Sequence, residues 1–365
     1  MPPTTRPTVP TMDDAAGFPT VFGRGLVGEL PNIAHPPYLV VTMADLWPLF
    51  EPALAGRDLA GVHLVESIEV DRLDSQLEGL PTASSVIGLG GGQAIDVAKF
   101  VSWRRRLPLF QVPTALTVNA PWGHRSGLRT AAGVRYLGWA VPEAVYIDVD
   151  VIQAAPPALN RSGVGDVLCY HTAHHDWRLA HDLGKVEGRW PYDERLVAAA
   201  RLRLDAVLAR LDDIRDVSEE GIRTLALAHR WGGSTFHDAG WNPRHIEGVE
   251  HFFFYNLERI TGRHFIHGQP VGLGIYIGSL WQDNHADDML AALHRAGVDV
   301  RPEAMGVTWD EVTEAMRTLP AFVREAGLWF TVVDAVPVDG SLVGRARSGI
   351  EAVYGAWDLG RCVSA

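Results

Sequence analysis

Short apolar runs alternate with amphipathic stretches along roughly the first 150 residues of the chain. Runs rich in Val, Leu and Ile predict strands at residues 38–42, 61–65, 85–89, 109–112 and 144–147. Helical periodicity separates several of them, at residues 45–54, 71–79 and 93–104, and Asp45 stands where its side chain can cap the first of these helices. A hairpin is predicted from Leu128 to Trp139. Strands that alternate with helices typically build a parallel sheet covered by helices, so this part is predicted to be an α/β domain.

The pattern changes after Asp150. Pro156-Pro157 interrupts the chain, and long helical patterns then dominate, as at residues 193–211, 219–237 and 247–260. We therefore expect a disordered Pro- and Thr-rich tail at residues 1–17, an α/β domain at residues 18–157, and an all-α domain at residues 158–365.

Composition and charge narrow the functional classes. The 365 residues carry a formal net charge of -12, which argues against nucleic acid or an anionic membrane as a partner, because both need a basic surface. No apolar run of about 18 residues is present, so no membrane span is expected. The two cysteines are too few for a disulfide framework, and we expect a cytoplasmic protein.

A glycine-rich turn is the first candidate for chemistry. Gly88 lies near the end of a predicted strand, and Gly90, Gly91 and Gly92 follow that strand and lead into a predicted helix, so backbone amides and the helix N-terminus can hold a diphosphate. Gln93 stands where a Rossmann motif has its third glycine, and the motif follows the third predicted strand instead of the first. The alternative is a tight turn without a ligand, but the strand and helix around it favour phosphate binding.

Thr114 and Thr117 follow the next predicted strand. Ligands bind at the carboxyl ends of strands in open α/β sheets, so both hydroxyls are candidates for ligand contacts. An ordinary turn with capping threonines is the alternative.

Three residues of the second half are candidate metal ligands. Asp166 follows two glycines at the start of an apolar helix, His251 follows Glu250 before three phenylalanines, and His267 precedes Gly268 at the start of another apolar helix. One carboxylate and two imidazoles are a common ligand set for a divalent metal with an open position. The chain has 15 histidines, so these residues alone leave a packing role open.

Taken together, these segments resemble the superfamily of glycerol dehydrogenase, glycerol-1-phosphate dehydrogenase and dehydroquinate synthase. The resemblance runs from about Gly23 to Gly278 and rests on residues 90–99, Pro113-Thr114, residues 163–166, Glu250-His251 and His267-Gly268, which follow the family's order and spacing. It implies a two-domain fold with the cofactor and metal in the cleft between the domains. It also implies that Asp166, His251 and His267 bind Zn²⁺ or a similar metal, with Fe and Ni as the alternatives.

The resemblance further implies that NAD or NADP binds in the first domain. The implied contacts are Gly91, Gly92, Asp96, Thr114 and Thr117, to which we add Gly90, Gln93, Gly123 and Asp45. Asp45 either caps a helix or repels the 2′-phosphate of NADP, so the sequence leaves the choice between the two dinucleotides open.

Within the superfamily, the glycerol-1-phosphate dehydrogenases are the nearest branch, on the Glu250-His251 pair and the Asp176-Trp177-Arg178 stretch. Three departures from that branch fall where the substrate is expected: Asn119 replaces an aspartate, Tyr255 replaces a second histidine, and residues 121–125 are bulkier and more basic. The metal and cofactor positions match while the substrate positions differ, so we expect the same chemistry on a different substrate.

The candidate substrate contacts are Asn119, Arg125, Asp166 and Tyr255. A guanidinium matches the geometry of a phosphate, and a solvent-facing arginine is the alternative for Arg125. His124 and Tyr255 are the candidate catalytic residues, as proton relays, with packing or surface roles as the alternatives.

These expectations define a metal-dependent, NAD(P)-linked dehydrogenase that interconverts a polyol, free or phosphorylated, with its ketone or aldehyde, as a homodimer or higher homo-oligomer. One rival is a sugar-phosphate cyclase that uses NAD transiently; Asp166 argues against it, because those cyclases carry a glutamate ligand there. A second rival is a non-catalytic dinucleotide-binding homologue.

Overall fold

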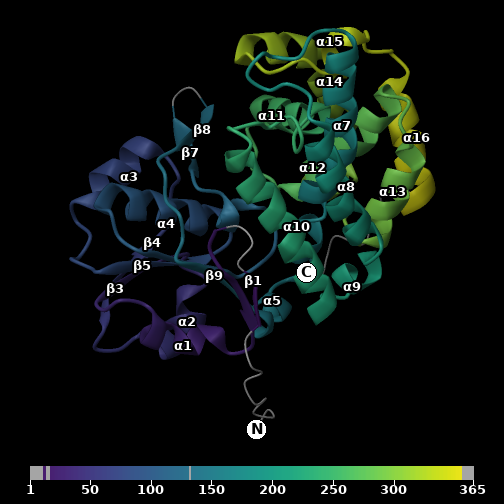
Figure 1. Cartoon of the computed structure of the whole chain (residues 1–365). Helices are drawn as coiled ribbons and strands as arrows, with labels where there is room; N and C mark the ends of the chain where they lie inside the picture. The colour runs from purple at the N-terminus through teal and green to yellow at the C-terminus, as the bar shows by residue number, and fades with distance from the viewer. Residues whose placement is uncertain (1–10, 14–16, 131–132, 356–365) are drawn as a thin grey trace. The chain divides into compact units, whose positions relative to one another are not determined.

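The computed structural model describes residues 11–13, 17–130 and 133–355. The chain forms two compact units: Met1–Asn160 with Val217–Asp238, and Arg161–Asp216 with Ala239–Ala365. Figure 1 shows a sheet covered by helices in the first unit and a bundle of helices in the second.

A seven-stranded sheet, in the order β1-β2-β9-β6-β5-β3-β4, forms the centre of the first unit. β1 pairs antiparallel with β2, and every other neighbouring pair is parallel. The predicted parallel α/β domain is therefore confirmed. The strands are β1 (Thr11–Asp13), β2 (Thr20–Gly23), β3 (Tyr38–Thr42), β4 (Leu59–Leu64), β5 (Ser85–Gly90), β6 (Leu109–Pro113) and β9 (Ala144–Asp148).

Two apolar cores lie on the two faces of this sheet. One holds Val40 and Ile87 with residues of α1 and α2, and the other holds Leu39 and Val86 with residues of α3 and α4. Burial on both faces explains why the strands read as continuous apolar runs. The helices of this unit are α1 (Leu26–Ile33), α2 (Trp47–Leu54), α3 (Val70–Leu77), α4 (Gly92–Arg105), α5 (Val149–Ala154) and α10 (Glu219–Asp238), with the 3₁₀ turn η1 (Ala120–Trp122); α6 (Pro157–Ser162) spans the division between the units.

The predicted hairpin is present as β7 (Ser126–Thr130) and β8 (Gly133–Leu137), which pair antiparallel as a separate small sheet. The residues at its tip, 131–132, lie outside the described residues. The predicted cap by Asp45 is wrong, because Leu46 occupies the N-cap position of α2 and no side chain caps this helix.

The division of the chain differs from the predicted one in two places. The first unit ends at Asn160, and Val217–Asp238, which was predicted to belong to the helical domain, clusters with the first unit. Within the predicted tail, Thr11–Asp13 form β1, whereas residues 1–10 and 14–16 lie outside the described residues.

The second unit consists of helices joined by loops, and its described residues form no strand. Its helices are α7 (Gly165–Asp182), α8 (Glu194–Leu208), α9 (Leu211–Arg215), α11 (Val249–Thr261), α12 (Gly268–Trp281), α13 (Ala286–Arg295), α14 (Trp309–Ala326), α15 (Val332–Ala335) and α16 (Leu342–Tyr354), with the 3₁₀ turn η2 (Pro302–Met305). α12 is buried along nearly its whole length and packs on α7, α11, α13 and α16, which accounts for its uniformly apolar sequence. Across the described ranges, no helix is both long and apolar enough to cross a bilayer.

Candidate functional site

The glycine turn lies at the point of the sheet where the strand order reverses. β3 and β5 are neighbours, but the chain leaves β3 toward β4 on one side and leaves β5 toward β6 on the other. In open α/β sheets, the carboxyl ends of two such strands form the crevice that binds ligands. Gly90 ends β5 and Gly92 begins α4, so the sequence motif occupies this position.

The backbone of the turn explains why glycine is required. Gly90 has φ 152°, and a β-carbon there would lie 2.7 Å from the Cβ of Ala94. A β-carbon on Gly92 would lie 3.0 Å from a methyl carbon of Val118. No side chain caps α4 at its N-terminus, so the first amides of this helix are available to an anion.

The remaining predicted cofactor residues differ in how exposed they are and in whether other side chains already bind them. Asp45 and Gln93 are exposed, near the carboxyl ends of β3 and β5 respectively, and Thr114 follows β6 and donates its amide to the Gly90 carbonyl at 3.1 Å. Thr117 is half-buried in the loop that follows. Asp96 is engaged inside the protein: its carboxylate pairs with Lys99 at 2.6 Å and accepts the Gly127 amide.

The loop of residues 119–125 carries four further predicted site residues. Asn119 precedes η1, and Gly123 follows it. His124 is buried, with its ring stacked on His237 at 4.5 Å and tilted against Trp139 at 4.9 Å, and this burial lowers the pKa of His124. Arg125 is half-buried, and burial lowers the pKa of its guanidinium.

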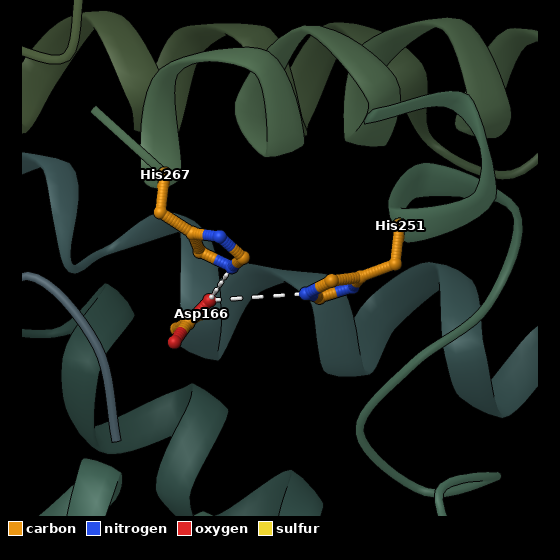
Figure 2. Close-up of side chains that lie close together, drawn as sticks. All are labelled: Asp166, His251 and His267. Carbon is orange, nitrogen blue, oxygen red and sulfur yellow. Dashed lines mark ion pairs between the residues drawn. The ribbon is translucent and has the colours of Figure 1, made fainter. Parts of the chain in front are cut away.

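The three predicted metal ligands come together in the second unit, from α7, from α11 and from the N-cap position of α12 (Figure 2). Oδ1 of Asp166, at the start of α7, lies 2.8 Å from Nε2 of His267 and 3.8 Å from Nε2 of His251. The three ligand atoms all lie within 4.8 Å of one another. Asp166 and His251 are buried and His267 is partly exposed, so one side of the cluster is open.

Glycines allow these helices to approach so closely. A β-carbon on Gly268 would overlap the carbonyl of Ser162, and one on Gly165 would lie 2.7 Å from the carbonyl oxygen of Gly268. These contacts join the N-terminus of α12 to the end of α6 and to the start of α7, next to Asp166 and His267. A β-carbon on Gly274 would lie 2.5 Å from the carbonyl oxygen of Glu250, which brings α11 against α12 in the same way.

Glu250 fixes the orientation of His251. One carboxylate oxygen accepts from Nδ1 of His251 at 2.9 Å and from the amide of Gly248 at 2.6 Å, and the other accepts from the hydroxyl of Thr172 at 2.6 Å. With Nδ1 as the donor, Nε2 of His251 is left as the nitrogen that faces Asp166. A second carboxylate of this kind holds a ligating imidazole in one tautomer and strengthens it as a ligand.

The charges around the cluster fit a bound cation. Burial lowers the pKa of His251, but the hydrogen bond to Glu250 and the charges of Glu247, Glu250 and Asp166 outweigh it and raise this pKa to about 9. Three carboxylates thus surround two imidazoles, and the donor set of one oxygen and two nitrogens suits a divalent metal. The residues present therefore fit the expected ion.

Cys169, Glu250 and His251 form a second grouping with ligand atoms within 4.8 Å of one another. It is less suited to a metal, because the Cys169 thiol donates to the carbonyl of Ile246 at 3.0 Å and burial raises its pKa well above the usual value. Glu250 is already occupied by three donors.

Glu247 is a polar residue near the cluster that sequence reasoning missed. Its carboxylate accepts a hydrogen bond from the hydroxyl of Tyr255 at 3.3 Å, and the ring of Tyr255 lies 6.0 Å from the ring of His251. Burial raises the pKa of Glu247. The spacing of four residues between Glu247 and His251 is the signal in the sequence that points to it.

The fold and the cluster together define a class of protein. One unit is an α/β sheet domain with a glycine turn suited to a dinucleotide, and the other is a helical domain in which a carboxylate and two imidazoles can bind a metal. The model of the iron-containing alcohol dehydrogenase family matches residues 53–156. A glycerol-1-phosphate dehydrogenase [NAD(P)+] from Thermofilum pendens is 30% identical over 334 residues, which cover 88% of this chain and 93% of that protein. One from Aeropyrum pernix is 32% identical and covers 73% of this chain and 72% of that protein.

The chain therefore belongs to the family of these glycerol-1-phosphate dehydrogenases, and part of it matches the iron-containing alcohol dehydrogenase model. Solved structures share the fold. A probable glycerol dehydrogenase from Sinorhizobium meliloti has a TM-score of 0.65 at 19% identity and covers 90% of this chain and 94% of that one. The 2-epi-5-epi-valiolone synthase ValA from Streptomyces hygroscopicus, solved with NAD⁺ and Zn²⁺ bound, has a TM-score of 0.63 at 17% identity and covers 92% of this chain and 97% of that one.

Proposed function

We propose that this protein is a metal-dependent, NAD(P)-linked dehydrogenase that interconverts a polyol with its ketone or aldehyde by hydride transfer. The observation that carries the proposal is the convergence of Asp166, His251 and His267 within 4.8 Å in a member of this family. The relatives named as NAD(P)+-linked glycerol-1-phosphate dehydrogenases support the dinucleotide and the alcohol substrate.

In this proposal Asp166, His251 and His267 hold a divalent metal, with Zn²⁺ as the first expectation. Such an ion, when bound, supplies Lewis acidity that lowers the pKa of an alcohol and polarises a carbonyl. Glu250 keeps Nε2 of His251 directed to the ion. The amides at the N-terminus of α4 bind the diphosphate of the dinucleotide.

We assign the proton relay to Tyr255 and give His124 a packing role. The Tyr255 hydroxyl is half-buried beside His251 and donates to Glu247, so a proton can pass from a substrate hydroxyl through the phenol oxygen to the carboxylate. His124 is buried between His237 and Trp139, which supports a structural role for its ring.

For the dinucleotide we propose a preference for NAD over NADP. Asp45 is exposed just beyond the carboxyl end of β3, the strand next to the glycine turn, and it caps no helix. A carboxylate at this position accepts hydrogen bonds from the adenosine ribose and repels a 2′-phosphate.

The substrate is proposed to differ from that of the relatives named above. Asn119 and Tyr255 stand where we expect the glycerol-1-phosphate dehydrogenases to have an aspartate and a histidine, so the hydrogen-bonding groups presented to the substrate change. Arg125 remains the candidate for an anionic group of the substrate, because its half-buried guanidinium can pair with a phosphate.

The test combines metal analysis with a screen of free and phosphorylated polyols. We expect the wild-type protein to hold about one divalent ion per chain and to reduce NAD⁺ with a polyol, and the His267→Ala variant to lose both the ion and the activity. Turnover without net change in NADH would indicate a cyclase. Dinucleotide binding by a protein that takes up no metal would indicate a non-catalytic homologue.

A further inference from the structure

Lys99 is an unusual residue in this chain. The sequence contains two lysines, Lys99 and Lys185. Apart from these and the histidines, every basic residue of the chain is an arginine. Lys99 lies on α4, two turns beyond the glycine turn, and is 1% exposed. A buried ammonium is costly unless its charge and its donors are satisfied.

The partners of Lys99 belong to one loop and one carboxylate. Its Nζ pairs with Asp96 at 2.6 Å and donates to the carbonyls of Ala120 at 3.0 Å, Gly123 at 3.2 Å and Arg125 at 2.6 Å. The carboxylate compensates the charge, and the three carbonyls fix the path of the loop at three points within six residues.

The same loop is held from its other side by α10. A β-carbon on Gly233 would lie 2.8 Å from the carbonyl oxygen of Asn119, so helix and loop are in direct contact. Nε2 of His237 accepts a hydrogen bond from the amide of His124 at 2.7 Å. Residues 119–125 are thus fixed through their backbone by α4 and by α10.

An ammonium suits this position better than a guanidinium. Its compact charge carries three donors that can diverge to separate acceptors, whereas the planar guanidinium directs its donors in a rigid fork. Three carbonyls and a carboxylate lie around a single nitrogen, so the three N–H groups are shared among four acceptors, which a compact ammonium can serve better than a planar fork.

We propose that Lys99 is a positioning residue for substrate binding: its ammonium sets the conformation of residues 119–125, the loop that carries the substrate contacts Asn119 and Arg125. The inference rests on the proposed function, since it assigns this loop to the substrate of that reaction. It makes α4 serve two purposes, with its N-terminus binding the dinucleotide and its second turn ordering the loop.

The test compares Lys99→Met with Lys185→Met, which removes the other, exposed lysine. Amide hydrogen exchange of residues 119–125 measures how stably the backbone of the loop is held, and this measurement does not depend on catalytic activity. We expect Lys99→Met to speed exchange there by about tenfold or more, as the loss of about 1.4 kcal/mol of local stability requires. We also expect KM for the polyol to rise at least about tenfold while the dissociation constant of NADH changes less than about threefold. Lys185→Met should leave all three quantities unchanged.

If Lys99→Met does not fold, Lys99→Gln keeps two N–H donors without the charge and should show the same changes to a smaller degree. Unchanged exchange in residues 119–125 of a folded variant would overturn the proposal. So would a parallel rise of the NADH dissociation constant and the polyol KM, because that pattern describes general damage to the first unit. If the wild-type protein oxidises no polyol, the proposed function fails, whereas hydrogen exchange still decides whether Lys99 orders the loop.

Discussion

At the scale of single residues, the cluster depends on the carboxylate beside it as well as on its three ligands. Glu250 accepts from His251, Gly248 and Thr172 and so directs one imidazole nitrogen toward Asp166. The sequence offered Asp166, His251 and His267 as candidate ligands, and the resemblance to a known superfamily implied that they bind a metal. The residue pattern gave no sign that Glu250 would hold His251, since adjacent residues on a helix do not usually face each other.

Replacing Glu250 with glutamine should weaken metal binding without removing it. An outer carboxylate of this kind is typically worth about 10–100-fold in metal affinity. Competition with a chelator of known affinity measures the change. Glu258→Gln, on the same helix α11, is the matched control and should bind metal as the wild type does. Equal metal affinity in Glu250→Gln and wild type would contradict the role given to this carboxylate.

Asp45 should decide between the two dinucleotides. In Asp45→Asn the charge that repels a 2′-phosphate is gone, so the ratio of kcat/KM for NADP to that for NAD should rise by about tenfold or more. Initial rates with each dinucleotide at saturating polyol give the ratio. A ratio that stays at the wild-type value would place the adenosine ribose away from Asp45.

At the scale of elements, close contacts through glycine set the distances between the helices of the second unit. Gly165 and Gly268 let α7 and α12 meet at their N-termini, and Gly274 lets α11 approach α12. Each ligand thus stands beside a contact that only glycine permits. This close approach of the backbones explains why a glycine stands next to both Asp166 and His267.

A methyl group on Gly268 should therefore remove the metal site. In Gly268→Ala the β-carbon would overlap the backbone of Ser162, and the shift that relieves the overlap moves His267. Overpacking of this kind costs about 1–3 kcal/mol or more of the free energy of unfolding. Metal content and thermal unfolding are the measurements.

Gly344→Ala on α16 is the control for that variant. A β-carbon at Gly344 meets nothing within 4 Å, so alanine should be neutral or stabilise the helix by up to about 1 kcal/mol. Normal metal content in Gly268→Ala would show that the contact of Gly268 with Ser162, at the end of α6, does not position the ligands.

The elements that the sequence predicts are those with strong periodicity. The strand at residues 38–42 and the helix beginning near residue 93 follow from apolar runs and a glycine signal. β2 and α1 were missed, because β2 has four residues and α1 contains Pro31, which disturbs the helical pattern. α10 was recognised as a helix but placed in the other unit, since periodicity says which face is buried and not which partner covers it.

At the scale of the whole molecule, three buried histidines make stability depend on pH. Burial lowers the pKa of His174, His237 and His245 to about 3, against 6.5 in the unfolded chain. Between these values the unfolded state binds more protons than the native state, so stability falls as the pH drops below 6.5. Each histidine contributes up to about 1.4 kcal/mol per pH unit in this range.

Groups whose pKa is raised in the folded protein, among them Asp96, Asp176, Glu247 and His251, act in the opposite direction. Burial raises the pKa of Asp176 to about 7, so its native carboxyl takes up a proton before the unfolded one and gains stability as the pH falls. Burial also lowers the pKa of His63, His124, His171 and His175, so the histidines with a lowered pKa outnumber the raised groups named above, and the free energy of unfolding should decrease between pH 6.5 and pH 5. Urea unfolding at several pH values measures it. His245→Gln should show a shallower decrease than the wild type, and an identical slope in the two proteins would contradict the assignment.

The account as a whole depends on one cation held by Asp166, His251 and His267. Anomalous diffraction from crystals of the metal-loaded protein, recorded at the absorption edge of the metal, locates that ion directly. The account predicts a single strong peak about 2.0–2.2 Å from an oxygen of Asp166 and from Nε2 of both histidines. A peak at another group of residues, or no peak in crystals of protein that retains activity, would contradict it.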